Sequence, residues 1–192
     1  MLICIVGKSC SGKTYICELL KQYSNNIVHL DIDTISHKIL TYPSVYTELQ
    51  KTFGPSVWDG SSINRKALAQ IVFNSETEMA KLTDITWPPM EIAIDEFISQ
   101  NRNKIILLDW QLLLKTKYYE LSDLKILVDS PLEIRTSKAI MRDRITKEAF
   151  LTREKAAYQF NYNDFDYVIN NDYSNKVKEK VKKIYDESII SR

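Results

Sequence analysis

The sequence predicts an α/β fold in which a five-stranded parallel sheet lies between two layers of helices. Five short apolar runs have the length of buried strands, and longer segments with helical periodicity separate most of them. These runs are residues 2–6, 27–30, 104–108, 124–128 and 167–169. Alternating strands and helices favour a parallel sheet, because each crossover lays a helix on one of its faces.

The chain of 192 residues is long enough for one domain, which we divide into a core and two additions. The core takes about residues 1–40 and 102–192. The long gap after the second strand has helical periodicity, so we expect a helical insertion at about residues 41–101 that shapes a substrate pocket. About residues 138–164 are rich in Arg, Lys and Tyr and predict a helical lid over the carboxyl edge of the sheet. Ser174 is the expected N-cap of the last helix.

Charge and cysteine content restrict the class of partner. Lys and Arg number 26 against 25 Asp and Glu, so the chain has no overall field that would attract nucleic acid or an anionic membrane. No apolar run approaches the roughly 18 residues of a membrane helix. Cys4, Cys10 and Cys17 are odd in number and have no C-x-x-C spacing, which argues against disulfides and a zinc site. We therefore expect a soluble cytoplasmic protein that acts on a small molecule, as a monomer or small homo-oligomer.

The most informative segment is the phosphate loop, Gly7-Lys8-Ser9-Cys10-Ser11-Gly12-Lys13-Thr14, which fits G-x-x-x-x-G-K-[ST] without a mismatch. It follows an apolar run and precedes a helical one, as the motif requires. The alternative is a chance match, with a probability on the order of one per cent at average residue frequencies. The loop amides and helix N-terminus would bind phosphates, Lys13 the β/γ oxygens and Thr14 a Mg²⁺ ion. The residues assigned to ATP binding are Gly7, Cys10, Ser11, Gly12, Lys13, Thr14 and Tyr15.

The rest of the sequence narrows the reaction. It contains no N-K-x-D for guanine and no glycine-rich transporter signature, and it is short for an AAA+ module. A small P-loop kinase remains, which needs an acceptor pocket, a group that takes a proton from the acceptor hydroxyl, and arginines on a lid.

Carboxylates follow two predicted strands, where an open α/β sheet binds its ligands. Asp31 and Asp33 lie two residues apart, and share one side of the chain if it stays extended. Either is a candidate base or a Mg²⁺ ligand through water; alternatively, Asp33 caps the following helix and Asp31 caps a loop. Asp109 ends the third strand in the manner of a Walker B acid, which indicates a role in the Mg²⁺ shell, or else is a turn residue.

The histidines and tryptophans give weaker signals. His29 and His37 have no evident nucleophile or metal partner in the sequence, so we expect structural roles for both. Trp58, Trp87 and Trp110 either line a pocket or belong to the core.

Taken together, the chain resembles the dephospho-CoA kinase family from about residue 2 to residue 175. Besides the loop and the paired acids, the matching pieces are Phe53-Gly54, Asp59-Gly60, Ile63-Asn64-Arg65, Trp87-Pro88, Leu112-Leu113, Met141-Arg142-Asp143 and the run from Asp166 to Asn171. The resemblance implies ATP-dependent and Mg²⁺-dependent phosphorylation of the ribose 3′-hydroxyl of dephospho-CoA, giving CoA and ADP. Another small P-loop kinase acting on a nucleoside or nucleotide is the alternative, followed by a nucleotide-binding regulatory protein without transfer activity.

The resemblance also implies roles for single residues. Lys13, Asp33 and Arg142 match catalytic positions, with Asp33 as the base and Arg142 as a lid arginine. Asn171 corresponds to a segment near the adenine. The implied acceptor pocket contains Asp33, Arg65, Trp87 and Asp109, and the implied metal ligands are Thr14 and Asp109. The chain departs from the family pattern at Cys10, Asn64, Trp87, Gln111, Lys115 and Lys138.

Overall fold

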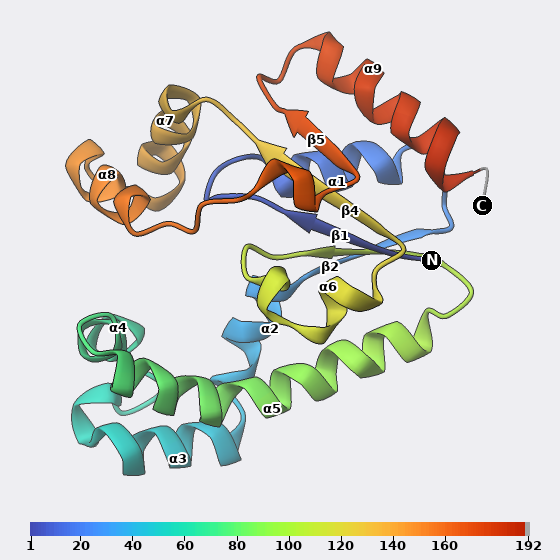
Figure 1. Ribbon diagram of the computed structural model, residues 1–192. Coiled ribbons are helices and arrows are strands. Elements are labelled where there is room, and N and C mark those ends of the chain that lie inside the picture. Colours follow the sequence, from blue (N-terminus) through green and yellow to red (C-terminus); the bar gives the residue numbers. More distant parts are fainter. Residues whose placement is uncertain (191–192) are drawn as a thin grey trace. The chain divides into compact units, whose positions relative to one another are not determined.

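The computed structural model describes residues 1–190 and contains a parallel sheet of five strands in the order β2-β3-β1-β4-β5 (Figure 1). The strands are β1 (Leu2–Val6), β2 (Ile27–Asp31), β3 (Ile105–Asp109), β4 (Leu124–Asp129) and β5 (Tyr167–Asn170). Each coincides with a predicted apolar run to within a residue at either end, and the predicted fold class is confirmed. Among residues 1–190, no helix is long and apolar enough to span a membrane.

Helices cover both faces of this sheet. The helices α1 (Lys13–Lys21) and α9 (Asn175–Ile184) pack together on one face, and α6 (Lys117–Leu121) lies on the other (Figure 1). Alternation along β1 explains the layers: Ile3 and Ile5 join the core formed with α1 and α9, whereas the Cys4 sulfur contacts the carbonyl of Tyr118 in α6 at 3.5 Å. A π-helix (Tyr185–Ile189) continues α9 and adds Ile189 to the same core.

Two helices follow β4. They are α7 (Leu132–Asp143) and α8 (Lys147–Lys155), which pack against each other, and the single turn η3 (Tyr162–Asp164) leads on to β5. Thr146 caps α8 by accepting a hydrogen bond from the Ala149 amide at 3.2 Å. A second single turn, η2 (Leu113–Lys115), lies between β3 and α6.

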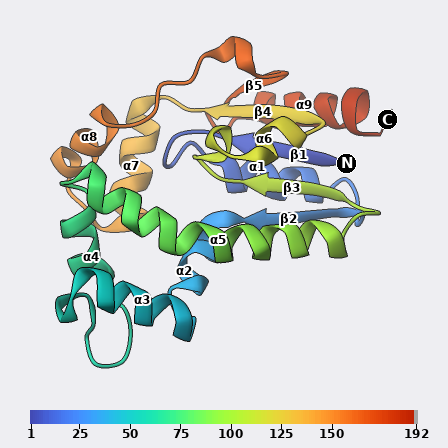
Figure 2. The ribbon, with the colours of Figure 1, turned by 60° about the horizontal axis from the view of Figure 1, so that its bottom comes forward.

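The chain divides into two compact units, of which the second is Ile32–Gln100 and the first is the remainder. The second unit is helical: α2 (Ile32–Ile39), α3 (Pro43–Phe53), η1 (Pro55–Val57), α4 (Arg65–Val72) and α5 (Glu76–Gln100). Figure 2 shows α3 and α4 beside α5, and an apolar cluster that includes Val45, Leu49 and Leu68 joins them. The helix α5 continues through Pro88 and Pro89, although each proline removes a hydrogen bond from the helix.

One local expectation is wrong. The chain does not stay extended from Asp31 to Asp33, because β2 ends at Asp31 and α2 begins at Ile32. Asp33 is therefore inside the first turn of α2 and is not its N-cap. An apolar Ile32 between two acids looks like strand alternation in the sequence, yet its side chain is fully buried at the start of a helix.

Candidate active site

The phosphate loop joins β1 to α1, and two of its glycines have no room for a side chain. A Cβ on Gly7 would lie 2.2 Å from the Val128 carbonyl oxygen. A Cβ on Gly12 would lie 2.2 Å from Asn171 Nδ2, and Gly12 also has the left-handed φ of +90°. The loop is therefore pressed against the ends of β4 and β5.

Cys10 occupies the loop position that the resemblance fills with glycine. Its φ of +60° lies in the left-handed region. This conformation is energetically unfavourable for any residue other than glycine. The side chain is buried in a small cluster with Ala139 of α7 and Phe150 of α8, to which Ile145 adds. This packing joins the phosphate loop to both helices.

Asn171 supports the loop from the end of β5. It is completely buried, and its Nδ2 donates to the Ser11 carbonyl at 2.9 Å, while its Oδ1 accepts from the Tyr173 amide at 3.1 Å. The resemblance places Asn171 in a segment near the adenine; in the structure, its side chain holds the backbone of the phosphate loop.

The acid at the end of β3 lies beside the first residues of α1. Asp109 is 3% exposed, and it accepts a hydrogen bond from Thr14 Oγ1 at 2.9 Å. Lys13 Nζ lies 3.8 Å from its other carboxylate oxygen. The predicted metal ligands Thr14 and Asp109 are thus in direct contact, and the sheet register places Asp109 opposite both Ile5 and Asp31.

A cavity of about 780 Å³ opens over the loop. It has the size of a small-molecule site. Cations dominate its lining, which contains Lys13, Lys138 and Arg142 against the single carboxylate of Asp31. The remaining lining residues are Cys10, Gly12, Thr14, Tyr15, Met141 and Tyr173. This charge balance suits a polyanionic ligand.

The aromatic side of the cavity is formed by two tyrosine rings that are tilted against each other. The rings of Tyr15 and Tyr173 lie 5.0 Å apart, and Lys138 Nζ lies 3.8 Å from the centre of the Tyr173 ring. A lysine over a ring in this way gains a cation–π attraction. Lys138 is therefore held over the residues that follow β5.

Arg142 stands in the last turn of α7, next to the phosphate loop. Its Nη2 donates to Ser9 Oγ at 3.3 Å, and its Nε donates to Asp143 Oδ1 at 2.7 Å. The hydrogen bond from Arg142 lowers the pKa of the Asp143 carboxyl, which therefore stays ionised. The arginine is largely exposed and lines the cavity.

A charged network that the sequence did not reveal links the loop to α7 and α8. The buried Arg135 makes a two-pronged pair with Glu154, at 2.6 and 2.8 Å, and Lys8 Nζ contacts Glu154 Oε1 at 2.9 Å. Hydrogen bonds, first from Arg135 and then from Lys8, lower the pKa of Glu154. The partners lie far apart in the sequence, and no local spacing predicts their contact.

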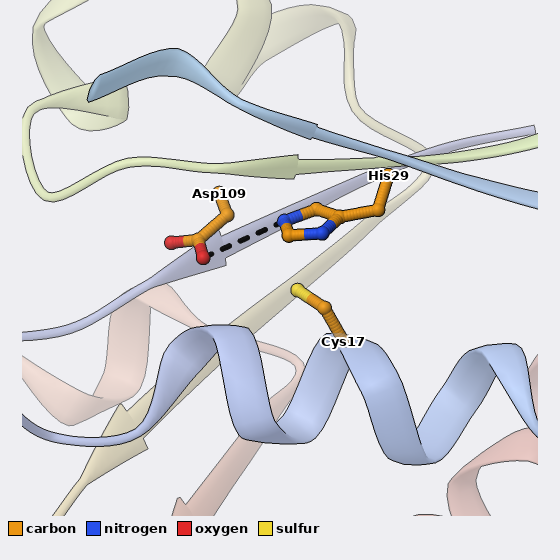
Figure 3. Close-up of side chains that lie close together, drawn as sticks. All are labelled: Cys17, His29 and Asp109. Atoms are coloured by element: carbon orange, nitrogen blue, oxygen red, sulfur yellow. Dashed lines mark ion pairs between the residues drawn. The ribbon is translucent and has the colours of Figure 1, made fainter. Parts of the chain in front are cut away.

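His29 lies beside two groups that can bind a metal, although no metal partner for it is evident in the sequence. Its ring lies on β2, with Nε2 3.5 Å from Asp109 Oδ2 and close to the Cys17 sulfur (Figure 3). His37 also has a polar partner, since its Nε2 lies 2.6 Å from Arg65 Nη2.

The second unit has a cavity of its own, of about 300 Å³. Three of the residues predicted for the acceptor pocket belong to this unit, and one of them, Arg65, lines the cavity. Arg65 and His37 line this cavity, together with Trp58, which stacks on Tyr46 at 5.2 Å. Asp33 is exposed in α2, and the half-buried Trp87 belongs to α5. Of the sequence-predicted site, the first unit gathers the loop, Asp109, Arg142 and Asn171, while the second holds Asp33, Arg65 and Trp87.

Comparison with known proteins identifies the family. The family model described as dephospho-CoA kinase matches residues 1–177. The chain is 30% identical to the dephospho-CoA kinase of Aquifex aeolicus over 95% of both chains. It is 27% identical to that of Latilactobacillus sakei, over 94% of this chain and 92% of the relative.

Solved structures agree with the fold. The crystal structure of TT1252 from Thermus thermophilus has a TM-score of 0.82 and 25% identity, with 98% of this chain and 97% of that one covered. The dephospho-CoA kinase from Campylobacter jejuni has a TM-score of 0.66 at 22% identity, over 97% of this chain and 96% of that chain. By its sequence match over nearly the whole length, the chain belongs to the dephospho-CoA kinase family.

Proposed function

We propose that this protein transfers the γ-phosphoryl group of ATP to the ribose 3′-hydroxyl of dephospho-CoA and releases CoA and ADP. The observation that carries the proposal is the contact of Asp109 with Lys13 and Thr14, two residues that line a cationic cavity. Family membership supplies the acceptor.

ATP binding follows from the loop. Its amides and the N-terminus of α1 point at the phosphates, and Lys13 brings its charge to the β/γ oxygens. The hydroxyl of Thr14 and the carboxylate of Asp109 are oxygen donors, which fit Mg²⁺, and these two residues would hold it. When bound, the ion neutralises charge on the phosphate oxygens.

Proton transfer and charge neutralisation fall to two further residues. We assign the base to Asp33, which matches the family position, and keep Asp31 as the alternative because it lines the cavity of the first unit. Arg142 donates a hydrogen bond to the loop residue Ser9, which supports a role for its planar guanidinium in binding phosphoryl oxygens as transfer proceeds. About residues 138–164, which include the second half of α7 and all of α8, form the proposed lid, which excludes water from the phosphates.

Acceptor binding is proposed for the second unit. Arg65 offers a cation for an anionic group of dephospho-CoA, and Trp58 and Tyr46 offer stacked rings in the same cavity. Trp87, from α5, is assigned to the same task by its match to the family pattern.

An ADP-release assay across dephospho-CoA, nucleosides and nucleoside monophosphates tests the proposal, with the product identified by mass. We expect turnover with dephospho-CoA and none above background with the other acceptors. Lys13→Ala is the control for contaminating kinases, with kcat lowered about 10² to 10³-fold. Turnover only with a nucleoside or nucleotide would overturn the proposed acceptor, and ATP binding with no acceptor turnover would leave a regulatory protein.

A further inference from the structure

Three side chains with metal-binding atoms converge beneath the phosphate loop. Cys17 comes from α1, His29 from β2 and Asp109 from β3, and Figure 3 shows the cysteine sulfur directed from the helix toward the imidazole. One ligand atom from each residue lies within 4.8 Å of the other two. The cluster is closed off from solvent, because Cys17 is fully buried, Asp109 is 3% exposed and the His29 side chain is 9% exposed.

The imidazole of His29 has the orientation of a metal ligand. Its Nε2 is buried and makes no hydrogen bond with any residue from 1 to 190, a state that costs free energy unless another partner is bound. On the opposite edge of the ring, Nδ1 lies 3.9 Å from Glu18 Oε1. Histidines that bind a metal through one nitrogen turn the other toward a carboxylate or carbonyl, which fixes the ring and its tautomer.

We propose that Cys17, His29 and Asp109 form a site for a thiophilic divalent transition metal of the Zn²⁺ class. Sulfur, imidazole nitrogen and carboxylate oxygen are the three donor types that Zn²⁺ takes in proteins, with water completing a tetrahedron. A thiol ligand discriminates against Mg²⁺, which prefers oxygen. The new site therefore differs in metal class from the one assigned to Thr14 and Asp109.

The distances require only a small adjustment. Metal–ligand bonds of about 2.0 to 2.3 Å put neighbouring ligand atoms about 3.5 Å apart in a tetrahedral zinc site. The His29 Nε2 and Asp109 Oδ2 pair has this separation already, at 3.5 Å. A rotation of the Cys17 side chain completes the triangle, since its sulfur is within 4.8 Å of both.

Metal entry involves one proton and no electrons. The neutral thiol of Cys17 releases its proton to solvent as the sulfur binds the metal. Asp109 Oδ2 gives up the hydrogen bond from Thr14 and takes the metal instead. The nearby Lys13 ammonium, 3.8 Å from Asp109, opposes a second cation and keeps the affinity below that of a structural zinc site.

This exchange has a functional consequence that rests on the proposed kinase activity. When Asp109 binds the transition metal, its carboxylate cannot also keep the position in which it contacts Thr14 and would hold Mg²⁺. A metal bound at Cys17 and His29 therefore inhibits phosphoryl transfer even when Mg²⁺ is in excess.

Titration of the whole protein with Co²⁺ tests the site without an activity measurement. We expect one equivalent to produce the near-ultraviolet band of a thiolate bound to Co²⁺, and Zn²⁺ to remove it. Cys17→Ala should abolish the band, and His29→Gln should weaken binding by about tenfold or more. Cys4→Ala is the matched control, since Cys4 is a second buried thiol that contacts Ser122 and Tyr118 instead.

Thermal melting verifies that each variant is folded. The proposal is overturned if the wild-type protein gives no such band, or if the band survives Cys17→Ala at full strength. Kinase assays then compare Zn²⁺ inhibition of the wild type and Cys17→Ala, with about tenfold less inhibition expected in the variant. Equal inhibition would refute the link to Asp109. Absence of kinase activity before any Zn²⁺ is added would refute the proposed function and leave the Co²⁺ result standing.

Discussion

The two carboxylates near the end of β2 have different backbone settings. Asp31 is the last residue of the strand and faces the cavity over the phosphate loop, whereas Asp33 stands in the first turn of α2. Apart from the family resemblance, nothing in the sequence distinguishes Asp31 from Asp33 as the candidate base. The change from strand to helix between them makes their roles separable by substitution.

Asp33→Asn is expected to lower kcat with dephospho-CoA by about 10² to 10⁴-fold, because it removes the proposed proton acceptor. Asp31→Asn keeps Asp33 and should lower kcat by less than about tenfold. Steady-state kinetics, together with the Kd for ATP of each variant, separate lost chemistry from lost binding. If the order of the two effects were reversed, the base would be Asp31.

Gly12 and Gly60 form a matched pair for measuring how tightly the loop is packed. Both have left-handed backbones, with φ of +90° and +95°, but an added Cβ meets Asn171 and Tyr173 at Gly12 and no atom within 4 Å at Gly60. Gly60→Ala should cost only the backbone strain of about 1 to 2 kcal/mol. Gly12→Ala should cost more and also abolish ATP binding, as measured by thermal unfolding and nucleotide titration. Equal losses of stability in the two variants would show that Asn171 and Tyr173 move aside easily to admit the added Cβ.

At the scale of elements, ion pairs join helices α7 and α8 to the phosphate loop. Arg135 of α7 and Lys8 of the loop share the carboxylate of Glu154 in α8. The pKa of Glu154 lies below its ordinary 4.5, so its charge stabilises the fold above about pH 4.5 and this contribution is lost as pH falls through the lowered pKa.

Glu154→Gln should therefore destabilise the protein at neutral pH by about 2 kcal/mol, since two charged donors lose the negative charge of their acceptor and one of its two oxygens. The difference from the wild type should shrink below pH 4.5, when the wild-type carboxyl also becomes protonated. Denaturant unfolding at several pH values measures both effects. Glu133→Gln, on the exposed surface of α7, is the control, and a pH-independent difference would count against the network.

The elements themselves were predictable to the extent that their signals are local. The five strands are apolar runs, and the phosphate loop is a contiguous motif, so both are evident in the sequence. The start of α2 was missed because Ile32 fits strand alternation. The network of Arg135 and the cluster of His29 were missed because their partners come from separate elements that only the sheet topology brings together.

At the scale of the whole molecule, the two units divide the proposed work. The first holds the phosphate loop and its cationic cavity, and the second holds the cavity with Arg65 and Trp58. Because a ligand stabilises the part that binds it, protection from hydrogen exchange should report each task separately.

Mg²⁺-ATP is expected to slow exchange in residues 7–14 and around Asn171 and Tyr173, with little change in α3 and α4. Dephospho-CoA alone should slow exchange around His37, Trp58 and Arg65. Hydrogen-exchange mass spectrometry of the full chain measures both, with Lys13→Ala as the control for the nucleotide effect. Protection by dephospho-CoA that is confined to the first unit would contradict the division.

The hydrogen bond from Asn171 to Ser11 joins the phosphate loop to a residue 160 positions later in the sequence. Ser11 is synthesised first, and its carbonyl can accept this hydrogen bond only after the residue 160 positions later has been added. A nascent chain that has not yet reached Asn171 therefore lacks the hydrogen bond that supports the phosphate loop, even if β1 and α1 have already formed. Nucleotide binding by the complete loop therefore requires a polypeptide that has been translated beyond Asn171.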